Sequence, residues 1–597
     1  MNNIFNSVLI KDVNRNAFDL SHSVKLTTEF NKLVPFLAQE VYPNETWEDT
    51  TEVFARFAPL KAPILAHLDI KTFFFFVPWR LCWQGWRRFI TDGSDGHPKD
   101  ITPPALPVWS FYEGGLFSPE TSRLLSNLVT QCWCNGSLAD YLGFPTPNIR
   151  YCDDIETALT RGSITEDERD SINEKVVTFC RTDIDFPLMP FFAYQLVYDE
   201  YFRNPNIQEM RLLPWCNEYG DSPTLSSGRH SVNSLQGLKM SNITDLFTLR
   251  SINWASDYFT SALPFLQRGE DVKIPFGGDG KLVFQSHGST LSPAAHTRVV
   301  QVDQPFNGTA GKVTFNNGVA RDEKGQPLDV DVTSNHKVDV QNVDATINDL
   351  RRAFTLQKWR EKIARVGSRY IEQIKAHFSQ TSSDARLQRP EFLGGGIMPV
   401  IVSDTEQMSG ALMQSGDKSF VSTPQGTLTG QIHSYGKSNK FRKHFEEHGI
   451  LLGLVTCVPK PEYQNLYNRQ WLRRDPLDFY FPEFQHLGEQ EVKRCELYTK
   501  FGASKEVNEG VFGYQQRFAE LRYIPSTCHG DFKDTLGYWT MNRRFDSQPS
   551  LNSQFVTADA NNDIFAYTDD DFHHIWLEIA NNITAVRPLD KYAIPTF

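Results

Sequence analysis

The sequence predicts a mainly β fold whose strands pair across long stretches of chain. The 597 residues include 44 Phe, 20 Tyr and 12 Trp, residue types that pack well on the faces of sheets. The 33 Pro and 37 Gly are spread along the chain and predict many turns and irregular loops. Three clear strand patterns lie far apart in the sequence, so we expect a sheet structure with long insertions between strands.

The three strand patterns differ in how completely they predict burial. Residues 64–77 begin with alternating apolar and polar positions and end in a continuous run, with Phe at each of residues 73–76. Residues 572–579 alternate again, with Ile575, Leu577 and Ile579 on one face. Residues 450–458 are almost wholly apolar, which predicts a strand that is buried on both faces.

The middle of the chain changes character twice. Residues 269–342 contain short alternating pieces, at 297–302, 328–332 and 337–340, among Gly, Asn and Asp, and we expect a β-rich insertion that faces solvent. Residues 346–378 then predict one long amphipathic helix, with Thr346 and Asp349 placed as a capping box. Its expected buried stripe recurs at steps of three and four residues: Leu356, Trp359, Ile363, Val366, Tyr370, Ile374 and Phe378.

Charge and cysteine content exclude several classes of protein. The formal net charge is −12, which argues against coating of nucleic acid by the overall field of the protein. The nine cysteines form no set of close pairs typical of a zinc site, and we expect reduced thiols. No apolar run approaches the roughly 20 residues of a membrane span, and the first residues lack a secretory pattern, so we expect folding in a cytoplasm.

Motifs of catalysis and cofactor binding are incomplete in this sequence. The glycines of residues 277–281 imitate part of a phosphate-binding loop, but Leu282 stands where a hydroxyl residue is needed, so a hairpin turn is the better interpretation. Residues 569–571 are three Asp without the spacing of a calcium loop. Pairs of acids such as Glu489 and Glu491 are unavoidable among 72 acidic residues. We therefore predict no catalytic residue, no metal site and no cofactor.

Two segments are candidates for contact with nucleic acid. Arg469, Trp471, Arg473 and Arg474 combine an aromatic ring with cations, a mixture suited to stacking bases and holding phosphates of a single strand. The favoured alternative is that Trp471 anchors a subunit contact while the arginines pair with acids. The predicted helix also carries an excess of Lys and Arg, for which a solvated polar face is the favoured explanation.

Several segments in a consistent order resemble microvirus major capsid proteins, on the gokushovirus-like side of the family. The most characteristic are LQKWREKIARVGSRY at residues 356–370 and SSDARLQRPEFLGG at residues 382–395. The others are FDLSH (18–22), FFFFVPWR (73–80), DYFTSALP (257–264), FEEHG (445–449), PEFQHLGEQEV (482–492), FGYQQRFAELRYIPSTCHGDFK (512–533) and NITAVRPLDKY (582–592).

The resemblance implies an eight-stranded viral jelly roll, an antiparallel β-sandwich with long inter-strand loop insertions and a few helices. It also implies a T=1 icosahedral shell of sixty copies around a circular single-stranded DNA genome, assembled in the cytoplasm of a bacterial host. Implied partners are packaged DNA, a small basic DNA-packaging protein, a pilot or minor capsid protein, and a host surface receptor. The alternative is an extracellular β-rich protein that binds or hydrolyses glycans.

The resemblance and the patterns together divide the chain into five expected parts. Residues 269–342, as the surface insertion, are expected to build a protrusion near the three-fold axes that touches the host. The other parts are an N-terminal arm (1–50), the first part of the jelly roll (51–268), an amphipathic helix (343–384), and the second part of the jelly roll with the C-terminal segment (385–597).

Overall fold

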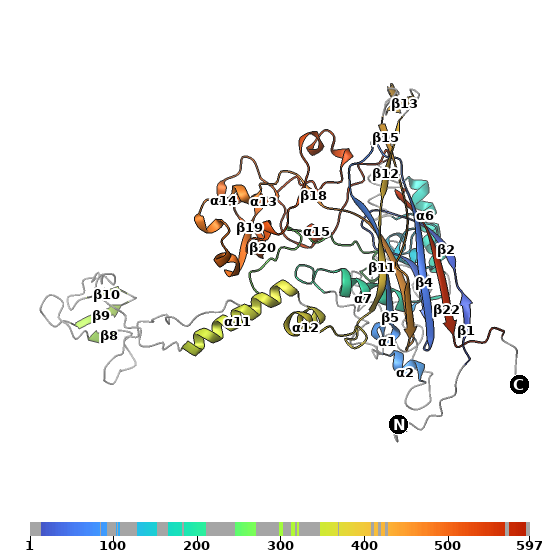
Figure 1. The fold of residues 1–597 in the computed structure, drawn as a ribbon, viewed down its shortest axis with the longest axis horizontal. Helices are drawn as coiled ribbons and strands as arrows, with labels where there is room; N and C mark the ends of the chain where they lie inside the picture. The colour runs from blue at the N-terminus through green and yellow to red at the C-terminus, as the bar shows by residue number, and fades with distance from the viewer. Residues whose placement is uncertain are drawn as a thin grey trace, which may run out of the picture. The chain divides into compact units, whose positions relative to one another are not determined.

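The computed structural model consists of two compact units, which are described separately here (Figure 1). The larger unit spans Met1–Leu266 and Ala364–Phe597, and the smaller unit spans Gln267–Ile363. The described residues are 14–83, 85–91, 103, 105–107, 128–151, 165–181, 184–210, 245–269, 298–301, 312–316, 319–321, 347–367, 369–406, 411–415, 419–423, 428–567 and 572–592.

A seven-stranded antiparallel sheet forms one layer of the larger unit. Its centre is β4 (Glu45–Phe57), which pairs with β22 (Ile575–Arg587) from Phe57–Ile575 to Thr46–Val586. The remaining strands are β1 (Asn16–Asp19), β2 (His22–Thr28), β12 (Ile401–Glu406), β15 (Leu428–Lys437) and β16 (Phe441–Phe445). The expected N-terminal arm therefore supplies strands, and its boundary at residue 50 falls inside β4.

A four-stranded antiparallel sheet forms the second layer, in the order β11 (Glu391–Pro399), β5 (Leu68–Pro78), β17 (Gly449–Pro459) and β3 (Val34–Val41). The predicted buried strands at residues 64–77 and 450–458 are confirmed as β5 and β17, although β5 begins only at Leu68. The predicted strand at residues 572–579 is also confirmed, and it continues to Arg587 as β22.

The two sheets enclose a common core, so the larger unit contains an antiparallel β-sandwich. Phe74 and Phe76 of β5 pack in one cluster with Val53 of β4 and Ile579 of β22. Successive residues of a strand point to opposite faces, so the intervening Phe75 points the other way. Phe74, Phe75 and Phe76 are thus buried, and Phe73 is partly buried, because both faces of this sheet are covered.

Helices cover the outer face of the four-stranded sheet. Phe75 and Leu452 pack in a second cluster with Phe191 and Phe192 of α7 (Met189–Val197).

The larger unit also contains two short antiparallel sheets outside the main layers. They are formed by β6 (Ala105–Pro107) with β7 (Asp185–Pro187), and by β13 (Ala411–Ser415) with β14 (Ser419–Thr423). The described residues before 210 also include the helical elements α1 (Trp79–Cys82), α2 (Trp86–Ile90), α4 (Leu138–Tyr141), α6 (Glu166–Cys180) and the π-helix η3 (Tyr198–Phe202), and a helical segment at residues 128–132.

A third apolar cluster joins residues 258–262 to the loop-rich residues 460–556. Its buried members include Tyr258, Phe259, Tyr463, Leu497 and Phe555. Its strands are β18 (Glu462–Tyr463), β19 (Glu489–Lys493), β20 (Val511–Gln516) and β21 (Ser526–Thr527). Its helices are α13 (Arg494–Leu497), α14 (Lys505–Asn508) and α15 (Ser553–Val556). The 3-10 turns are η4 (Arg469–Trp471), η5 (Pro476–Asp478), η6 (Pro482–His486), η7 (Ala519–Leu521), η8 (Gly530–Lys533) and η9 (Gly537–Trp539).

The smaller unit contains an antiparallel sheet of β8 (Arg298–Gln301), β9 (Lys312–Asn316) and β10 (Val319–Arg321). The expected strand at residues 297–302 corresponds to β8. The strands expected at residues 328–332 and 337–340 lie outside the described residues, as do residues 277–281, 569–571 and Thr346. None of the helices among the described residues has the length and apolar content needed to span a membrane.

The prediction of one continuous helix over residues 346–378 is wrong. The structure contains α11 (Ile347–Val366) and α12 (Tyr370–Phe378), separated at Gly367, whose φ of 111° cannot continue a right-handed helix. The prediction that its apolar stripe is buried is also wrong, because the single chain leaves the stripe half-buried or exposed. Ile363, Val366 and Ile374 are half-buried, and four members of the stripe are exposed: Leu356, Trp359, Tyr370 and Phe378.

Candidate nucleic-acid interface

The candidate residues Arg469 and Trp471 belong to a single 3-10 turn, η4. Asn468 caps this turn because its side-chain oxygen accepts a hydrogen bond from the backbone of Gln470 at 3.1 Å. The backbone of Tyr467 donates to the carbonyl of Cys495, which fixes the turn against α13. The first and last side chains of this three-residue turn point in different directions. Arg469 points inward, whereas Trp471 is 69% exposed.

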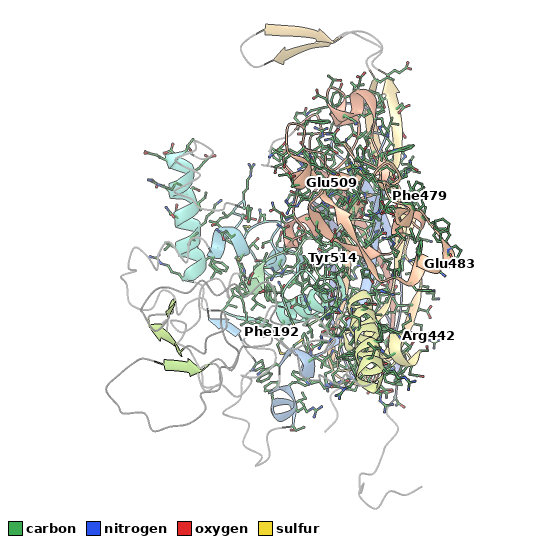
Figure 2. The ribbon with its side chains drawn as sticks, turned by 90° about the vertical axis from the view of Figure 1, so that its left-hand side faces the viewer. Phe192, Arg442, Phe479, Glu483, Glu509 and Tyr514 are labelled. Carbon is green, nitrogen blue, oxygen red and sulfur yellow. The ribbon has the colours of Figure 1, made fainter. Side chains whose placement is uncertain are left out.

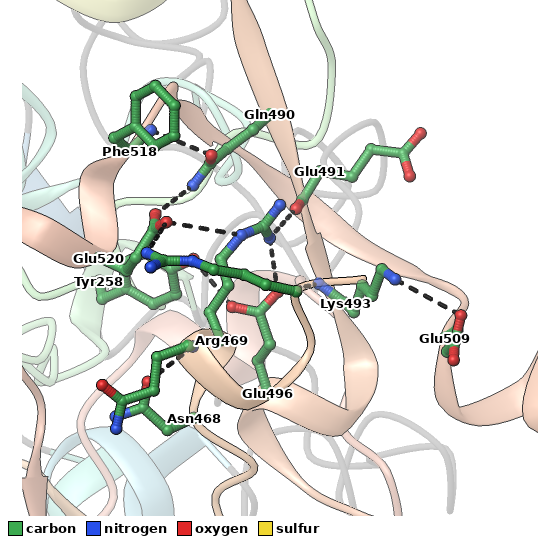
Figure 3. A network of polar contacts seen from close by, with 12 residues as sticks. Tyr258, Asn468, Arg469, Gln490, Glu491, Lys493, Glu496, Glu509, Phe518 and Glu520 are labelled. Carbon is green, nitrogen blue, oxygen red and sulfur yellow. Dashed lines mark hydrogen bonds and ion pairs between the residues drawn. The ribbon is translucent and has the colours of Figure 1, made fainter. Parts of the chain in front are cut away.

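Arg469 is the centre of a buried polar network (Figure 3). Its Nη1 lies 2.7 Å from Oε1 of Glu496, and its Nε lies 3.9 Å from Oε1 of Glu520. The Tyr258 hydroxyl donates to the other oxygen of Glu496 at 2.9 Å. Burial raises the pKa of the Glu496 carboxyl, and the Arg469 guanidinium opposes that rise. Arg469 is therefore a structural cation, already matched by carboxylates.

Arg473 and Arg474 differ in their accessibility. Arg473 is largely buried, its Nη2 lies 3.4 Å from Oε1 of Glu520, and its guanidinium lies 5.5 Å from the centre of the Phe479 ring. Arg474 pairs with Glu509 at 3.1 Å, but 61% of its side chain remains exposed. The structure thus brings Arg469 and Arg473 together on Glu520, and leaves Trp471 and Arg474 at the surface.

A groove of about 360 Å³ adjoins Trp471 and contains residues that the sequence reasoning missed. Tyr467 and Trp471 line it together with Tyr523, His529 and Lys533. The Nζ of Lys533 donates to Oδ1 of Asn465 at 3.3 Å, which holds the ammonium group beside the aromatic side chains. These residues come from two segments about 50 residues apart. The signal that could have found them is the second mixture of aromatic and basic residues at 517–533.

A larger cleft of about 2190 Å³ lies along the edge strand β2 and adjoins β3 and β22. Its titratable residues include Lys25, Glu578 and His573. Burial lowers the pKa of His573, whose Nδ1 lies 2.9 Å from the Thr27 hydroxyl, so this ring favours its neutral form. This geometry supplies neither a nucleophile with an adjacent base nor a pair of carboxylates flanking a bond.

The described residues contain no cluster of three or more His, Cys, Asp or Glu side chains that could hold a metal ion. The six cysteines whose side chains the structure describes are buried free thiols. Burial raises the pKa of Cys132 to about 12, which keeps this thiol protonated at neutral pH. It therefore lacks the thiolate form that nucleophilic attack and metal binding require.

Comparison with known proteins decides which family this architecture belongs to. A family model described as "Capsid protein (F protein)" matches residues 7–117 and 164–597. The chain belongs to this capsid protein family. This family and the three relatives described next confirm the identification from sequence as a microvirus major capsid protein, gokushovirus-like. The family relationship indicates a structural protein of the virion.

Three relatives of this phage capsid protein have similar lengths. The chain is 30% identical to capsid protein VP1 of Chlamydia phage 1, with 100% of this chain and 98% of the relative covered. It is 29% identical to VP1 of Bdellovibrio phage phiMH2K, and 25% identical to VP1 of Spiroplasma virus 4. Both of those matches cover 97% of this chain and 95% of the relative.

Proposed function

We propose that sixty copies of this capsid protein close into a T=1 icosahedral shell around a circular single-stranded DNA genome. The observation that carries the proposal is the family match over most of the chain, joined to a sandwich core that accepts long insertions. The expected setting is assembly in the cytoplasm of a bacterial host. The expected partners are a small basic DNA-packaging protein, a pilot or minor capsid protein and a host surface receptor.

We further propose that the sandwich is a viral jelly roll. β15 and β16 pair with successive parts of β4, so they serve as two halves of one strand. β1 and β2 likewise pair along β22 as an added edge. Counted this way, each sheet has four strands. One sheet contains β12, the combined strand β15–β16, β4 and β22, and the other contains β3, β5, β11 and β17. This supports an eight-stranded arrangement.

The shell proposal is tested by electron microscopy of particles formed by the purified full-length chain, together with its genome and packaging partner if these are required. Closed particles with sixty equivalent subunits are the expected result. A chain that stays monomeric under conditions where the complete virus assembles, or a shell with another subunit number, contradicts the proposal.

Contact between packaged DNA and Arg469, Trp471, Arg473 and Arg474 remains a proposal. Trp471 and Arg474 support it because a base can reach the exposed ring and a phosphate can reach the exposed guanidinium. The pairing of Arg469 and Arg473 with Glu496 and Glu520 favours a supporting role for these two residues. Removing the charges of Arg473 and Arg474 should leave shells that assemble with less packaged or ordered DNA. Loss of assembly without a separable effect on DNA overturns this role.

Residues 269–342 are proposed as an outward insertion that contributes to host attachment near a three-fold axis. The antiparallel sheet of β8, β9 and β10 within a separate compact unit supports a semi-independent segment. Replacing residues 269–342 with a short Gly and Ser linker should preserve folding of the sandwich while impairing attachment or three-fold packing. A position on the inner wall of the particle contradicts the proposal.

A further inference from the structure

Residues 475–487, here called the aromatic arm, display large apolar side chains at the surface of the larger unit. Five of them are between 47% and 65% exposed: Leu477, Phe479, Tyr480, Phe481 and Leu487. Phe479 and Glu483 of the arm lie at the margin of the unit in Figure 2. Exposed apolar groups are common one at a time, but a contiguous set on one short segment is typical of an interaction site.

The aromatic arm is held in a defined conformation before any partner binds. Asp478 accepts hydrogen bonds from the backbones of Arg474 and Asp475 at 3.0 and 3.1 Å, which caps the turn η5. The ring of Tyr480 meets Phe518 edge to face with 5.2 Å between centres. Arg517 donates to the carbonyl of Leu477. Because the exposed side chains are already positioned, binding would order little further chain.

The exposed area of the aromatic arm is large enough to form the centre of a protein interface. An aromatic side chain presents about 150–250 Å² of surface, so five large side chains near half exposure contribute about 500 Å². A stable interface buries about 800 Å² on each partner. The arm therefore supplies more than half of one side.

The charge of the aromatic arm indicates what kind of partner it accepts. The arm contains Asp475, Asp478 and Glu483 and has neither Lys nor Arg, so its formal charge is −3 with His486 neutral. The arm itself supplies no Lys or Arg side chain that could bind a phosphate backbone. A second copy of the chain offers opposite charge on α11, which carries six Lys and Arg residues against two acids.

We propose that the aromatic arm is a contact surface between copies of this chain, with its aromatic side chains buried against a second copy in the shell. The inference rests on the proposed shell function, since assembly is what brings copies together. It assigns the apolar centre of a subunit interface to residues 477–487 and separates that role from the DNA contacts proposed for Trp471 and Arg474. The acidic residues form the polar rim that surrounds such a centre.

The direct test places a photo-crosslinking benzoylphenylalanine at Phe481 in the full-length chain and irradiates assembled particles. Covalent dimers of the chain are the expected product, identified by mass spectrometry. The same variant irradiated as unassembled subunits should give no dimers. Crosslinks to DNA or to another virion protein, or the absence of chain dimers in particles, overturn the inference.

A second measurement uses two substitutions at the same site. Phe481→Ser should lower the yield of particles by at least about tenfold, because an aromatic residue at an interface centre contributes a large share of the binding energy and the contact repeats in every subunit. Phe481→Leu, which keeps an apolar side chain, should retain most of the yield. Equal yields from both variants overturn the inference. If the unsubstituted chain forms no particles, the shell proposal fails instead.

Discussion

Residues 73–76 and residues 479–481 are both aromatic runs, and the structure treats them in opposite ways. The four Phe of β5 are wholly or largely buried, because β11 and β17 pair with both edges of that strand while two apolar clusters cover its faces. Phe479, Tyr480 and Phe481 lie between two 3-10 turns and are about half exposed. Aromatic content alone therefore does not distinguish the core of a shell subunit from the surface by which it assembles.

The difference originates in hydrogen bonding of the backbone. A strand in the middle of a sheet has its backbone groups paired on both sides, so its side chains can be covered from above and below without leaving polar atoms unsatisfied. The aromatic arm satisfies its backbone through local turns and through caps from Asp475 and Asp478. It can therefore remain at the surface as an ordered segment.

The largest expected effect concerns the buried run. Phe74 is fully buried between Phe36 and Phe441, with ring centres 5.8 and 5.1 Å away. Phe74→Ala should reduce the free energy of unfolding by about 3–5 kcal/mol, because it removes apolar contacts and leaves a cavity. Denaturant unfolding of the free subunit measures this. A loss below about 1 kcal/mol would show that this position is not part of a packed core.

The next effect compares a buried arginine with an exposed one. Arg469→Ala should destabilise the subunit by about 3 kcal/mol, because Glu496 would remain buried without its cation. Arg474→Ala, the matched control at an exposed ion pair, should cost at most about 1 kcal/mol. Thermal unfolding of both variants tests the contrast, and equal losses would contradict the burial of the Arg469 network.

A smaller effect on stability is expected from a carboxyl group that is buried within the sandwich. Desolvation raises the pKa of Asp49 to about 6, although its carboxylate accepts a hydrogen bond from the Thr51 hydroxyl at 3.1 Å. The folded state therefore binds the proton more tightly than the unfolded state, whose pKa is near 3.8. Stability contributed by this group should be present below pH 4 and lost as pH rises through 6.

The corresponding experiment is Asp49→Asn, which should remove this pH dependence and stabilise the subunit at pH 7 by about 2 kcal/mol. Melting temperatures of the parent and the variant between pH 4.5 and 7 give the measurement. Glu48→Gln, at the adjacent outward position of β4, should leave the slope above pH 5 nearly unchanged. Parallel profiles for the parent and Asp49→Asn would show that Asp49 does not titrate in this range.

The smallest expected effect on stability belongs to the aromatic arm. Phe481→Ser should change the free energy of unfolding of the free subunit by less than about 0.5 kcal/mol, because the side chain is already half in water. Denaturant titration beside Phe74→Ala makes the comparison direct. A loss of several kcal/mol would mean that the arm is part of the core of a single chain, and the two runs would no longer differ in kind.

The strands that the sequence predicted are those whose buried residues are mainly apolar. β4 was missed because Glu45, Asp49 and Thr51 occupy its inward positions beside Trp47 and Val53. Glu45 can be buried because Arg587 lies 3.0 Å away and the Trp47 ring nitrogen donates to it. These partners lie on another strand or depend on the folded geometry, so the alternation of polar and apolar residues did not reveal them.

The end of β22 was missed for a related reason. Asn581 and Asn582 are typical turn residues, yet Asn581 accepts a hydrogen bond from Thr51 at 3.0 Å inside the sheet. At the candidate site, the sequence predicted a mixture of rings and cations but not which guanidiniums were already paired. Glu496 and Glu520 lie 27 and 51 positions beyond Arg469, and only the fold brings them together.

The central claim is that assembly buries the aromatic arm, as folding of the single chain buries residues 73–76. Hydroxyl-radical footprinting of free subunits and assembled particles tests this most directly. Mass spectrometry would follow oxidation at Phe479, Tyr480 and Phe481, with residues 73–76 as the internal reference. We predict rapid oxidation of the arm in free subunits, strong protection in particles, and slow oxidation of residues 73–76 in both. An arm oxidised equally fast in subunits and particles would contradict the account.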